Sequence, residues 1–236
     1  MELDEIQKNM PEGITLAEDS DGLFLQADGQ ILRADFTRMI PRLKQSNLGG
    51  ELLVRAARIK GAEQPLTALD ATAGLGEDSL LLAAAGFTVT MYEYNPVVYA
   101  LLWDGLRRAA EIPELAEIVG RMQVIHADST EAMRTLEVPP DVILLDPMFP
   151  ERQKSALVKK KLQMIQKLEM PCTNEREMLR AALEAGAKKV IVKRPPKGPF
   201  LAGVKPDYSL SGKAVRFDCM VSPFAKKLQE WEKNDG

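Results

Sequence analysis

Four acidic residues occupy equivalent places in the sequence, each at or just beyond the end of a predicted β-strand. Asp70 closes "LTALDA", Glu93 closes "FTVTMYE", Asp128 follows "MQVIHA" and Asp146 closes "DVILLD". Because strands that alternate with helices form a parallel sheet, their carboxyl ends meet at one edge. We therefore expect the four carboxylates to converge on one crevice, which would favour a ligand with hydrogen-bond donors or positive charge.

The turn after the first of these strands, "DATAGLGED", contains two glycines. Gly74 and Gly76 allow the backbone to turn tightly and a ligand to lie close against it. Glycines of this kind also occur in purely structural turns, so that interpretation stays open. A dinucleotide site is a second alternative, because Glu93 falls about twenty residues further on, where an acid can hold a ribose.

The residues that open the following helix argue against a dinucleotide. Ser79 stands where the dinucleotide fingerprint has its third glycine, and the carboxylates of Glu77 and Asp78 would repel a pyrophosphate. An adenosyl ligand without phosphates removes this conflict. S-adenosylmethionine is such a ligand, and its positive sulfonium suits an acidic cleft.

This arrangement resembles that of the class I, Rossmann-like methyltransferases. The resemblance implies that Asp70, Gly74 and Gly76 lie beside the methionine part of S-adenosylmethionine. It also implies that Glu93 holds the ribose hydroxyls and that Asp128 meets the adenine amine.

A second group of residues, Asp146-Pro147-Met148-Phe149, follows an apolar strand directly. It resembles the (Asp/Asn)-Pro-Pro-(Tyr/Phe) motif of amino-methyltransferases, with Met148 in the third place. The motif implies a planar amine as acceptor: Asp146 and the Pro147 carbonyl accept its hydrogens and orient its lone pair, and Phe149 stacks on the base. Proline keeps that carbonyl free and the geometry stiff. The competing interpretation is a strand end with proline stops and a core phenylalanine.

Longer stretches are similar to the ribosomal RNA small subunit methyltransferase J family, which methylates the N2 amine of a guanosine in 16S rRNA. They are "DATAGLGEDSLLLAAAGFTVTMYEYNPVVYALLWDGL", "DPMFPERQKSALVKKK" and "VIVKRP", within roughly Asp70 to Pro195. Carried over by position, the family's cofactor contacts fall on Glu77, Asp78, Glu93, Tyr94, Asp128, Ser129 and Asp146.

The chain departs from its apparent relatives at several of these positions. Glu77 and Tyr94 stand where the family commonly has arginine, and Asp128 stands where it commonly has serine. At Thr72 the wider class usually has a glycine. These departures concern side chains, so the implied contacts through the backbone are less affected.

Basic residues flank two of the strand ends, and we expect them to contact RNA phosphates without reading the sequence. The candidates are Arg152, Lys154, Lys159, Lys160, Lys193 and Arg194. A solvated helix face is the ordinary interpretation of any single lysine. Their common location at the ligand-binding edge favours a basic rim around an acidic cofactor site.

The elements that must position these residues indicate an α/β protein. Residues 13–36 alternate around Asp-Gly turns, as in a hairpin, and "QSNLGGELLVRAARI" indicates a turn entering a helix. Strands and helices then alternate, and "YSLSGKAVRFDCMVSPF" indicates a closing hairpin. We predict a Rossmann-like class I methyltransferase sheet, mostly parallel with a C-terminal antiparallel hairpin, in a domain of residues 63–236. A small N-terminal β-hairpin and helix unit of residues 1–62 precedes it.

Composition narrows the possible partners. With 45% hydrophobic and 28% charged residues in 236, the chain can bury a sizeable core. The formal net charge of −3 gives no global basic field, so an anionic partner must meet a local patch. Two cysteines and one histidine argue against a metal site. The acidic N-terminus lacks the apolar core of a signal peptide, so we expect a cytoplasmic protein without a membrane partner.

The resulting hypothesis is an S-adenosylmethionine-dependent enzyme that methylates a guanosine N2 amine in 16S rRNA, as free RNA or in the small ribosomal subunit. One alternative keeps the cofactor and changes the acceptor to another planar amine, such as adenine N6 in DNA or a protein glutamine. Another alternative is a non-catalytic RNA-binding protein of ribosome assembly that retains the fold.

Overall fold

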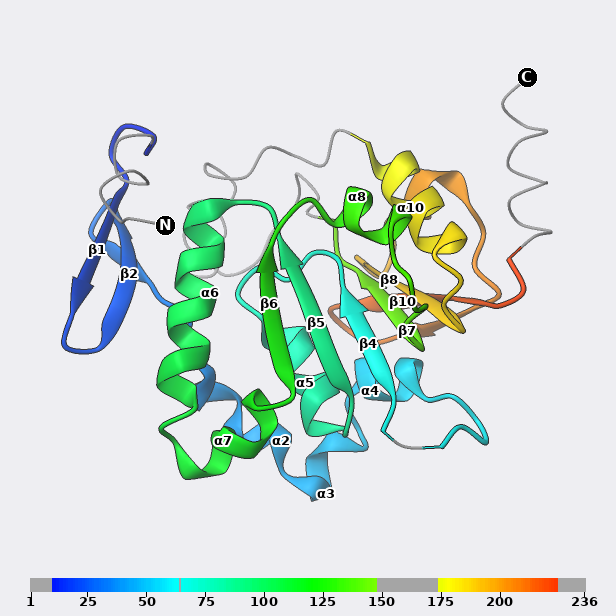
Figure 1. Cartoon of the computed structure of the whole chain (residues 1–236), viewed down its shortest axis with the longest axis horizontal. Coiled ribbons are helices and arrows are strands. Elements are labelled where there is room, and N and C mark those ends of the chain that lie inside the picture. The colour runs from blue at the N-terminus through cyan, green and yellow to red at the C-terminus, as the bar shows by residue number, and fades with distance from the viewer. Residues whose placement is uncertain (1–9, 64, 148–173, 225–236) are drawn as a thin grey trace.

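The centre of the molecule is a seven-stranded sheet with the order β6-β5-β4-β7-β8-β10-β9 (Figure 1). The computed structural model describes residues 10–63, 65–147 and 174–224. The strands are β4 (Thr67–Asp70), β5 (Thr88–Glu93), β6 (Met122–His126), β7 (Val142–Leu145), β8 (Lys189–Arg194), β9 (Tyr208–Ser211) and β10 (Arg216–Val221). The strands from β6 to β8 are parallel, whereas β10 runs antiparallel to both β8 and β9. The predicted fold class is confirmed.

Different helices cover the two faces of this sheet, because successive residues of a strand point to opposite sides. Leu144 and Ile191 belong to the core cluster with the first group of helices, whereas Ile143 and Val192 belong to the cluster with the second. The first group is α4 (Leu52–Ala57), α5 (Glu77–Ala84), α6 (Pro96–Ala109) and α7 (Pro113–Val119); the second is α8 (Ser129–Arg134), α10 (Glu175–Glu184) and the 3-10 turn η2 (Leu201–Gly203).

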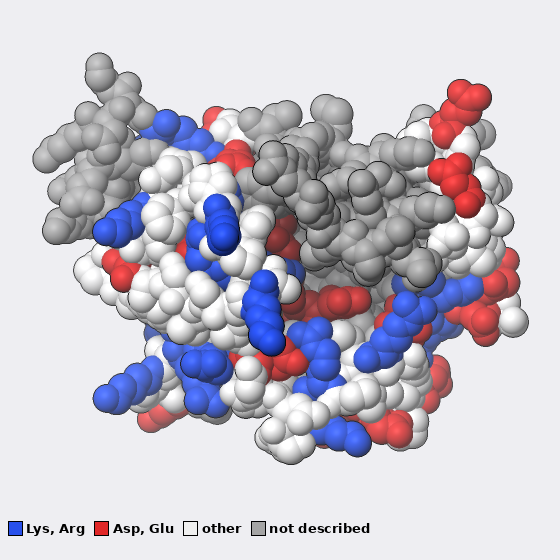
Figure 2. All heavy atoms as spheres, turned by 180° about the vertical axis from the view of Figure 1, so that it is seen from behind, with Lys and Arg blue, Asp and Glu red and all other residues white. Residues whose placement is uncertain are grey.

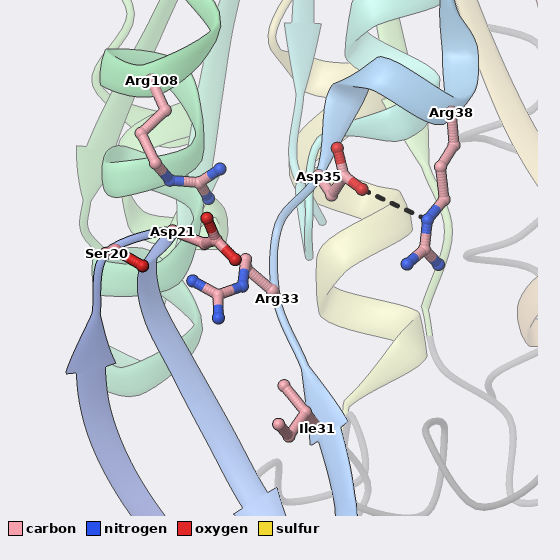
Figure 3. Close-up of a pocket in the computed structure, with 7 residues that line it drawn as sticks. All are labelled: Ser20, Asp21, Ile31, Arg33, Asp35, Arg38 and Arg108. Carbon is pink, nitrogen blue, oxygen red and sulfur yellow. Dashed lines mark ion pairs between the residues drawn. The ribbon is translucent and has the colours of Figure 1, made fainter.

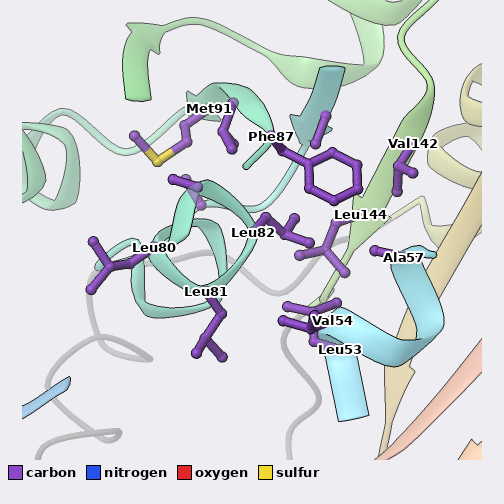
Figure 4. Packing of buried hydrophobic residues seen from close by; sticks show 14 of the residues in the cluster. Leu53, Val54, Ala57, Leu80, Leu81, Leu82, Phe87, Met91, Val142 and Leu144 are labelled. Carbon is purple, nitrogen blue, oxygen red and sulfur yellow. The ribbon is translucent and has the colours of Figure 1, made fainter. Parts of the chain in front are cut away.

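Strand β7 is buried on both faces. Its sequence Val-Ile-Leu-Leu has no polar alternation, as is typical of a central parallel strand, and none of its four residues is exposed. Figure 4 shows Leu144 next to Leu82 of α5, and both Leu144 and Val142 belong to the buried cluster that contains Leu53 of α4. The end of β7 is therefore held rigidly by the core below it.

The N-terminal residues form a small antiparallel sheet that packs on α6 (Figure 1). Its strands are β1 (Thr15–Asp19), β2 (Gly22–Ala27) and β3 (Gln30–Leu32). Leu25 of this sheet shares a buried cluster with Val97 and Leu101 of α6. Asp104 of α6 is 2% exposed and accepts the Leu23 N–H at 3.0 Å. The predicted hairpin thus exists, with a third strand.

Short helical turns connect the small sheet to the large one: η1 (Phe36–Met39), α2 (Ile40–Leu43) and α3 (Gln45–Leu48). Phe36 and Met39 lie in the same buried cluster as the large sheet, so this connection contributes to the main core. The domain division at residue 62 remains a prediction. No described helix is long and apolar enough to cross a membrane.

Candidate active site

The carboxyl ends of the parallel strands meet at one edge, as the sequence predicts. Asp70 and Glu93 are the last residues of β4 and β5, Asp146 directly follows β7, and Asp128 lies two residues beyond β6. Asp70 interacts electrostatically with Asp146, and Glu93 interacts with Asp70. Asp70 therefore lies within electrostatic range of two of the other three acids.

Asp70 fastens the first turn to helix α5. Its side chain is 2% exposed and accepts the Ser79 hydroxyl at 2.6 Å and the Thr72 N–H at 3.1 Å. Burial raises the pKa of Asp70 to about 6, against the effect of these hydrogen bonds, and the charges of Asp78 and Asp146 raise it further. The serine that replaces the third glycine of the dinucleotide fingerprint is thus a partner of this acid.

The two glycines of the turn serve different purposes. Both have positive φ, +53° at Gly74 and +78° at Gly76. A Cβ at Gly76 would lie 2.7 Å from the Leu102 Cδ1, so packing of α5 on α6 requires that glycine. A Cβ at Gly74 would meet no atom of the described residues within 4 Å, so this part of the structure leaves space beside Gly74 that a ligand can enter.

Glu93 closes the other side of this turn. It is 7% exposed, and it accepts the Gly74 N–H at 3.0 Å and the Asn95 N–H at 2.8 Å. Burial raises the pKa of Glu93 to about 7, although the backbone N–H groups favour its charged form. The next residue, Tyr94, exposes 74% of its surface, and its carbonyl contacts the His126 ring nitrogen at 2.9 Å.

Asp128 and Ser129 lie at the start of α8. The Asp128 side chain accepts the N–H groups of Thr130 at 2.7 Å and Glu131 at 3.3 Å, and so it caps this helix. Asp128 is exposed and Ser129 is buried. Contact of these residues with adenine remains a prediction.

Asp146 is connected to the first turn and to β8. Its N–H donates to the Thr72 hydroxyl at 2.6 Å. Thr72, at a position where the class usually has glycine, thus connects the first turn to the end of β7. Its Oδ2 lies 2.9 Å from the Lys193 ammonium, which also contacts the Asp78 Oδ2 at 2.5 Å. The sequence did not predict either contact of Asp146. It placed Lys193 on an RNA-facing rim, and it gave no signal for the hydrogen bond to Thr72.

Two residues of the predicted basic rim, Lys193 and Arg194, lie among the described residues. Lys193 pairs with Asp78 and Asp146, and the rim prediction is wrong for Arg194. Arg194 is 2% exposed, and it donates to the Pro199 carbonyl at 2.8 Å and pairs with Glu175 at 3.6 Å. Arg194 thus turns inward, because alternate residues of β8 face opposite sides, and it joins α10 to the loop after β8. Five further candidates lie outside the described residues: Phe149, Arg152, Lys154, Lys159 and Lys160. Pro147, which is buried, is the last described residue before them.

A separate pocket of about 570 Å³ lies between the small sheet, η1 and α6 (Figure 3). Its lining residues are Ser20, Asp21, Ile31, Arg33, Asp35, Arg38 and Arg108. Each arginine already has an acidic partner: Asp19 for Arg33, Asp35 for Arg38 and Asp104 for Arg108. The pocket therefore offers little uncompensated charge, and it contains none of the strand-end acids.

The strand-end group fits S-adenosylmethionine. The open space at Gly74 admits a ligand close to the backbone, and the buried Asp70 and Glu93 give an acidic environment that suits a cationic ligand without phosphates. Together with the parallel sheet, this site defines a Rossmann-like, S-adenosylmethionine-dependent methyltransferase.

Comparisons with known proteins lead to the same class. Residues 3–222 match a family model described as a putative SAM-dependent methyltransferase. A solved SAM-dependent methyltransferase of Neisseria gonorrhoeae superposes with a TM-score of 0.73 at 32% identity, covering 94% of this chain and 91% of that chain.

Curated relatives give the particular family. The chain is 45% identical to the ribosomal RNA small subunit methyltransferase J of Nitrosococcus oceani, over 82% of this chain and 78% of the relative. It is 42% identical to the protein of the same name from Thioalkalivibrio sulfidiphilus, over 89% and 85%. The chain belongs to the ribosomal RNA small subunit methyltransferase J family, and its methyl donor is S-adenosylmethionine.

Proposed function

We propose that the enzyme methylates the exocyclic N2 amine of one guanosine in 16S rRNA. The names of its relatives point to RNA of the small ribosomal subunit. The observation that carries the proposal is the 2.6 Å hydrogen bond from the Asp146 N–H to the Thr72 hydroxyl, because it brings the amine-binding motif against the cofactor turn. Such a substrate would place the activity in the cytoplasm.

In this proposal Asp146 and Pro147 prepare the amine for attack. S-adenosylmethionine, when bound, supplies an electrophilic methyl group on a positive sulfur. The Asp146 carboxylate and the Pro147 carbonyl accept the hydrogens of the amine, orient its lone pair and favour the positive charge that develops on nitrogen. Phe149 stacks on the guanine, and the released proton passes to water or to Asp146.

The cofactor contacts are proposed from position. Gly74 and Gly76 form the turn with Asp70 beneath it, Glu93 accepts the ribose hydroxyls, and Asp128 meets the adenine amine. The other proposed cofactor contacts are Glu77, Asp78, Tyr94, Ser129 and Asp146. The open space at Gly74 and the burial of Glu93 support this assignment.

A basic surface on the N-terminal helices supports an RNA partner. Residues 38–60 contain six basic residues and one acid, Glu51, a local formal charge of +5 in a chain of net −3. The basic residues, all exposed, are Arg38, Arg42, Lys44, Arg55, Arg58 and Lys60. The hydrogen bonds that Arg42 donates to Glu51, together with the charges of Asp78 and Glu77, raise the pKa of Arg42, so this part of the surface lies within electrostatic range of the start of α5.

Such a surface would hold phosphates around the target nucleotide without reading the base sequence. Figure 2 shows acidic side chains near the middle of one face, with Lys and Arg side chains on either side of them. Within the proposed rim, Arg152, Lys154, Lys159 and Lys160 remain candidates from sequence.

The test is methylation with labelled S-adenosylmethionine of small subunits, and of naked 16S rRNA, from a strain that lacks the enzyme. We expect label in N2-methylguanosine at a single position. Asp146→Ala should remove this label while leaving cofactor binding measurable by calorimetry, and the exposed Asp21→Ala should behave as wild type. Label in adenine or protein, no label, or full activity of Asp146→Ala would contradict the proposal.

A further inference from the structure

Lys193 connects the two halves of the candidate active site. Its ammonium lies between the Asp78 Oδ2 at 2.5 Å and the Asp146 Oδ2 at 2.9 Å, and 29% of its side chain is exposed. Asp78 belongs to α5, which follows the cofactor turn, whereas Asp146 belongs to the amine-binding motif after β7. One cation thus contacts an acid of α5 and an acid that directly follows β7.

Lys193, Asp146 and Asp78 come together because alternate residues of neighbouring strands face the same side of the sheet. Val192 of β8 pairs with Leu145 of β7, so Lys193 and Asp146 are the next residues along neighbouring strands. They continue the series of Leu144 and Ile191, which face α5. Helix α5 covers this face of the sheet, and Asp78 in its first turn completes the group.

The charge on Lys193 is fixed. Burial alone would lower the pKa of Lys193, but the charges of Asp78 and Asp146 outweigh it and raise the pKa well above the ordinary value. Lys193 is therefore a permanent cation, and it does not act as a proton donor or acceptor in the reaction.

We propose that Lys193 is a positioning residue for methyl transfer, which holds the Asp146 carboxylate ionised and oriented toward the amine while anchoring it to α5 through Asp78. This inference rests on the role proposed for Asp146. A carboxylate that contacts a cation through one oxygen retains further acceptor capacity, so the contact does not compete with the amine. The inward location of the ammonium also removes Lys193 from the RNA-facing rim.

Loss of the ammonium would leave acids facing one another. Among the described residues, Asp70 on β4 interacts electrostatically with Asp146, Asp78 on α5 shares the Lys193 ammonium with it, and Arg194 on β8 is a second cation that interacts with it. Without Lys193, the like charges of Asp70 and Asp78 would raise the pKa of Asp146, so protonation would remove the acceptor at a higher pH than in wild type.

The kinetic test compares Lys193→Met, Lys193→Arg and Lys188→Met. Lys188 is the matched control, because it pairs with Asp141 at 2.7 Å at the opposite end of β7 and is 61% exposed. We expect kcat of Lys193→Met to fall about 100-fold, the size of effect that misplacement of a reacting group produces, and KM for the cofactor to change much less than kcat. The acid limb of its pH–rate profile should move to higher pH.

The conservative variant separates positioning from folding. Lys193→Arg keeps the cation, so it should recover most of kcat and the wild-type pH profile, and Lys188→Met should match wild type throughout. Wild-type kcat and pH profile in Lys193→Met, in an enzyme that does methylate RNA, would overturn the positioning role and leave the proposed function intact.

A second readout is independent of the acceptor. Carbon-13 NMR of aspartate carboxyl groups, assigned with Asp146→Asn, follows the titration of Asp146 directly. We expect Asp146 to titrate at higher pH in Lys193→Met than in wild type or Lys193→Arg. If wild type fails to methylate RNA but this shift occurs, the function fails and the positioning stands; an unchanged Asp146 titration overturns the positioning.

Discussion

At the scale of single residues, the acids at the strand ends have structural partners of their own, besides the cofactor contacts proposed for them. Asp70 holds Ser79 and the Thr72 N–H, and Glu93 holds the N–H groups of Gly74 and Asn95. Both acids are buried, and burial raises the pKa of Asp70 to about 6 and of Glu93 to about 7. These groups therefore titrate close to neutral pH.

Cofactor affinity should follow the ionisation of Glu93. A ribose hydroxyl donates best to the charged carboxylate, so affinity for S-adenosylmethionine should rise by about tenfold from pH 6 to pH 8 as Glu93, with its pKa of about 7, loses its proton. Calorimetric titration across this range measures the change. Glu93→Gln should bind weakly at every pH, and a pH-independent affinity in wild type would contradict the assignment.

Ionisation of Glu93 should lower the stability of the ligand-free protein as pH rises, although it raises the affinity for the cofactor. Because Glu93 has a higher pKa folded than unfolded, the folded state binds more protons between pH 4.5 and about 7. The free energy of unfolding of the ligand-free protein should therefore fall as pH rises through this window. Denaturant titration should show a smaller fall in Glu93→Gln, with the part due to Asp70 remaining.

Thr72 should matter through its hydroxyl. Thr72→Val keeps the shape but leaves the Asp146 N–H without its acceptor, which should cost about 1–3 kcal/mol in the free energy of unfolding. Methyl transfer should also slow, because the end of β7 loses its connection to the cofactor turn. Thr72→Ser retains the hydroxyl and serves as the control in both chemical denaturation and kinetics; equal behaviour of the two variants would contradict this role.

At the scale of elements, the turn between β4 and α5 combines Gly74, beside which we propose that the cofactor lies, with Gly76, which packs against α6. Gly74 borders open space, whereas Gly76 lies against Leu102 of α6. A short loop can therefore place backbone close to a ligand and still bring two helices together. The alternating faces of β7 and β8 complete the site, because they direct Asp146 and Lys193 to the α5 side.

Alanine at the two glycines should separate these requirements. Gly76→Ala forces a Cβ within 2.7 Å of Leu102 at positive φ, so it should lower the free energy of unfolding by about 1–3 kcal/mol. Gly74→Ala carries only the backbone strain, about 1 kcal/mol, and should weaken cofactor binding more than it lowers stability. Thermal melts measure the loss of stability in both variants, and calorimetry measures their affinity for the cofactor. A larger loss of stability in Gly74→Ala than in Gly76→Ala would contradict this division of roles.

At the scale of the whole molecule, the small N-terminal sheet is attached through a buried charge. Asp104 of α6 is 2% exposed and binds the Leu23 N–H and the guanidinium of Arg108, which also donates to the Ala34 carbonyl at 2.6 Å. Together with the apolar contact of Leu25, this polar group fixes how the first strands lie on α6.

Asp104→Ala should therefore loosen the N-terminal sheet. Removing Asp104 leaves the Leu23 N–H without this acceptor and the partly exposed Arg108 without this acid, at a cost of about 1–3 kcal/mol. Hydrogen exchange should rise first in β1–β3, and the melting temperature should fall. Glu184→Ala, which removes an exposed pair with Arg180, is the control and should change stability by less than about 1 kcal/mol; uniform exchange in both variants would contradict the attachment.

The sequence by itself determined the kind of sheet, the strand-end acids and the amine motif. These features are local: alternation of apolar residues, glycines in turns and acids after strands indicate their structure within a few residues. Only the tertiary structure decided that Lys193 lies between Asp78 and Asp146, that Thr72 accepts the Asp146 N–H, and that Arg194 points inward. Strand order and the facing of side chains across neighbouring strands set these contacts, and they join residues tens of positions apart, beyond the reach of local periodicity.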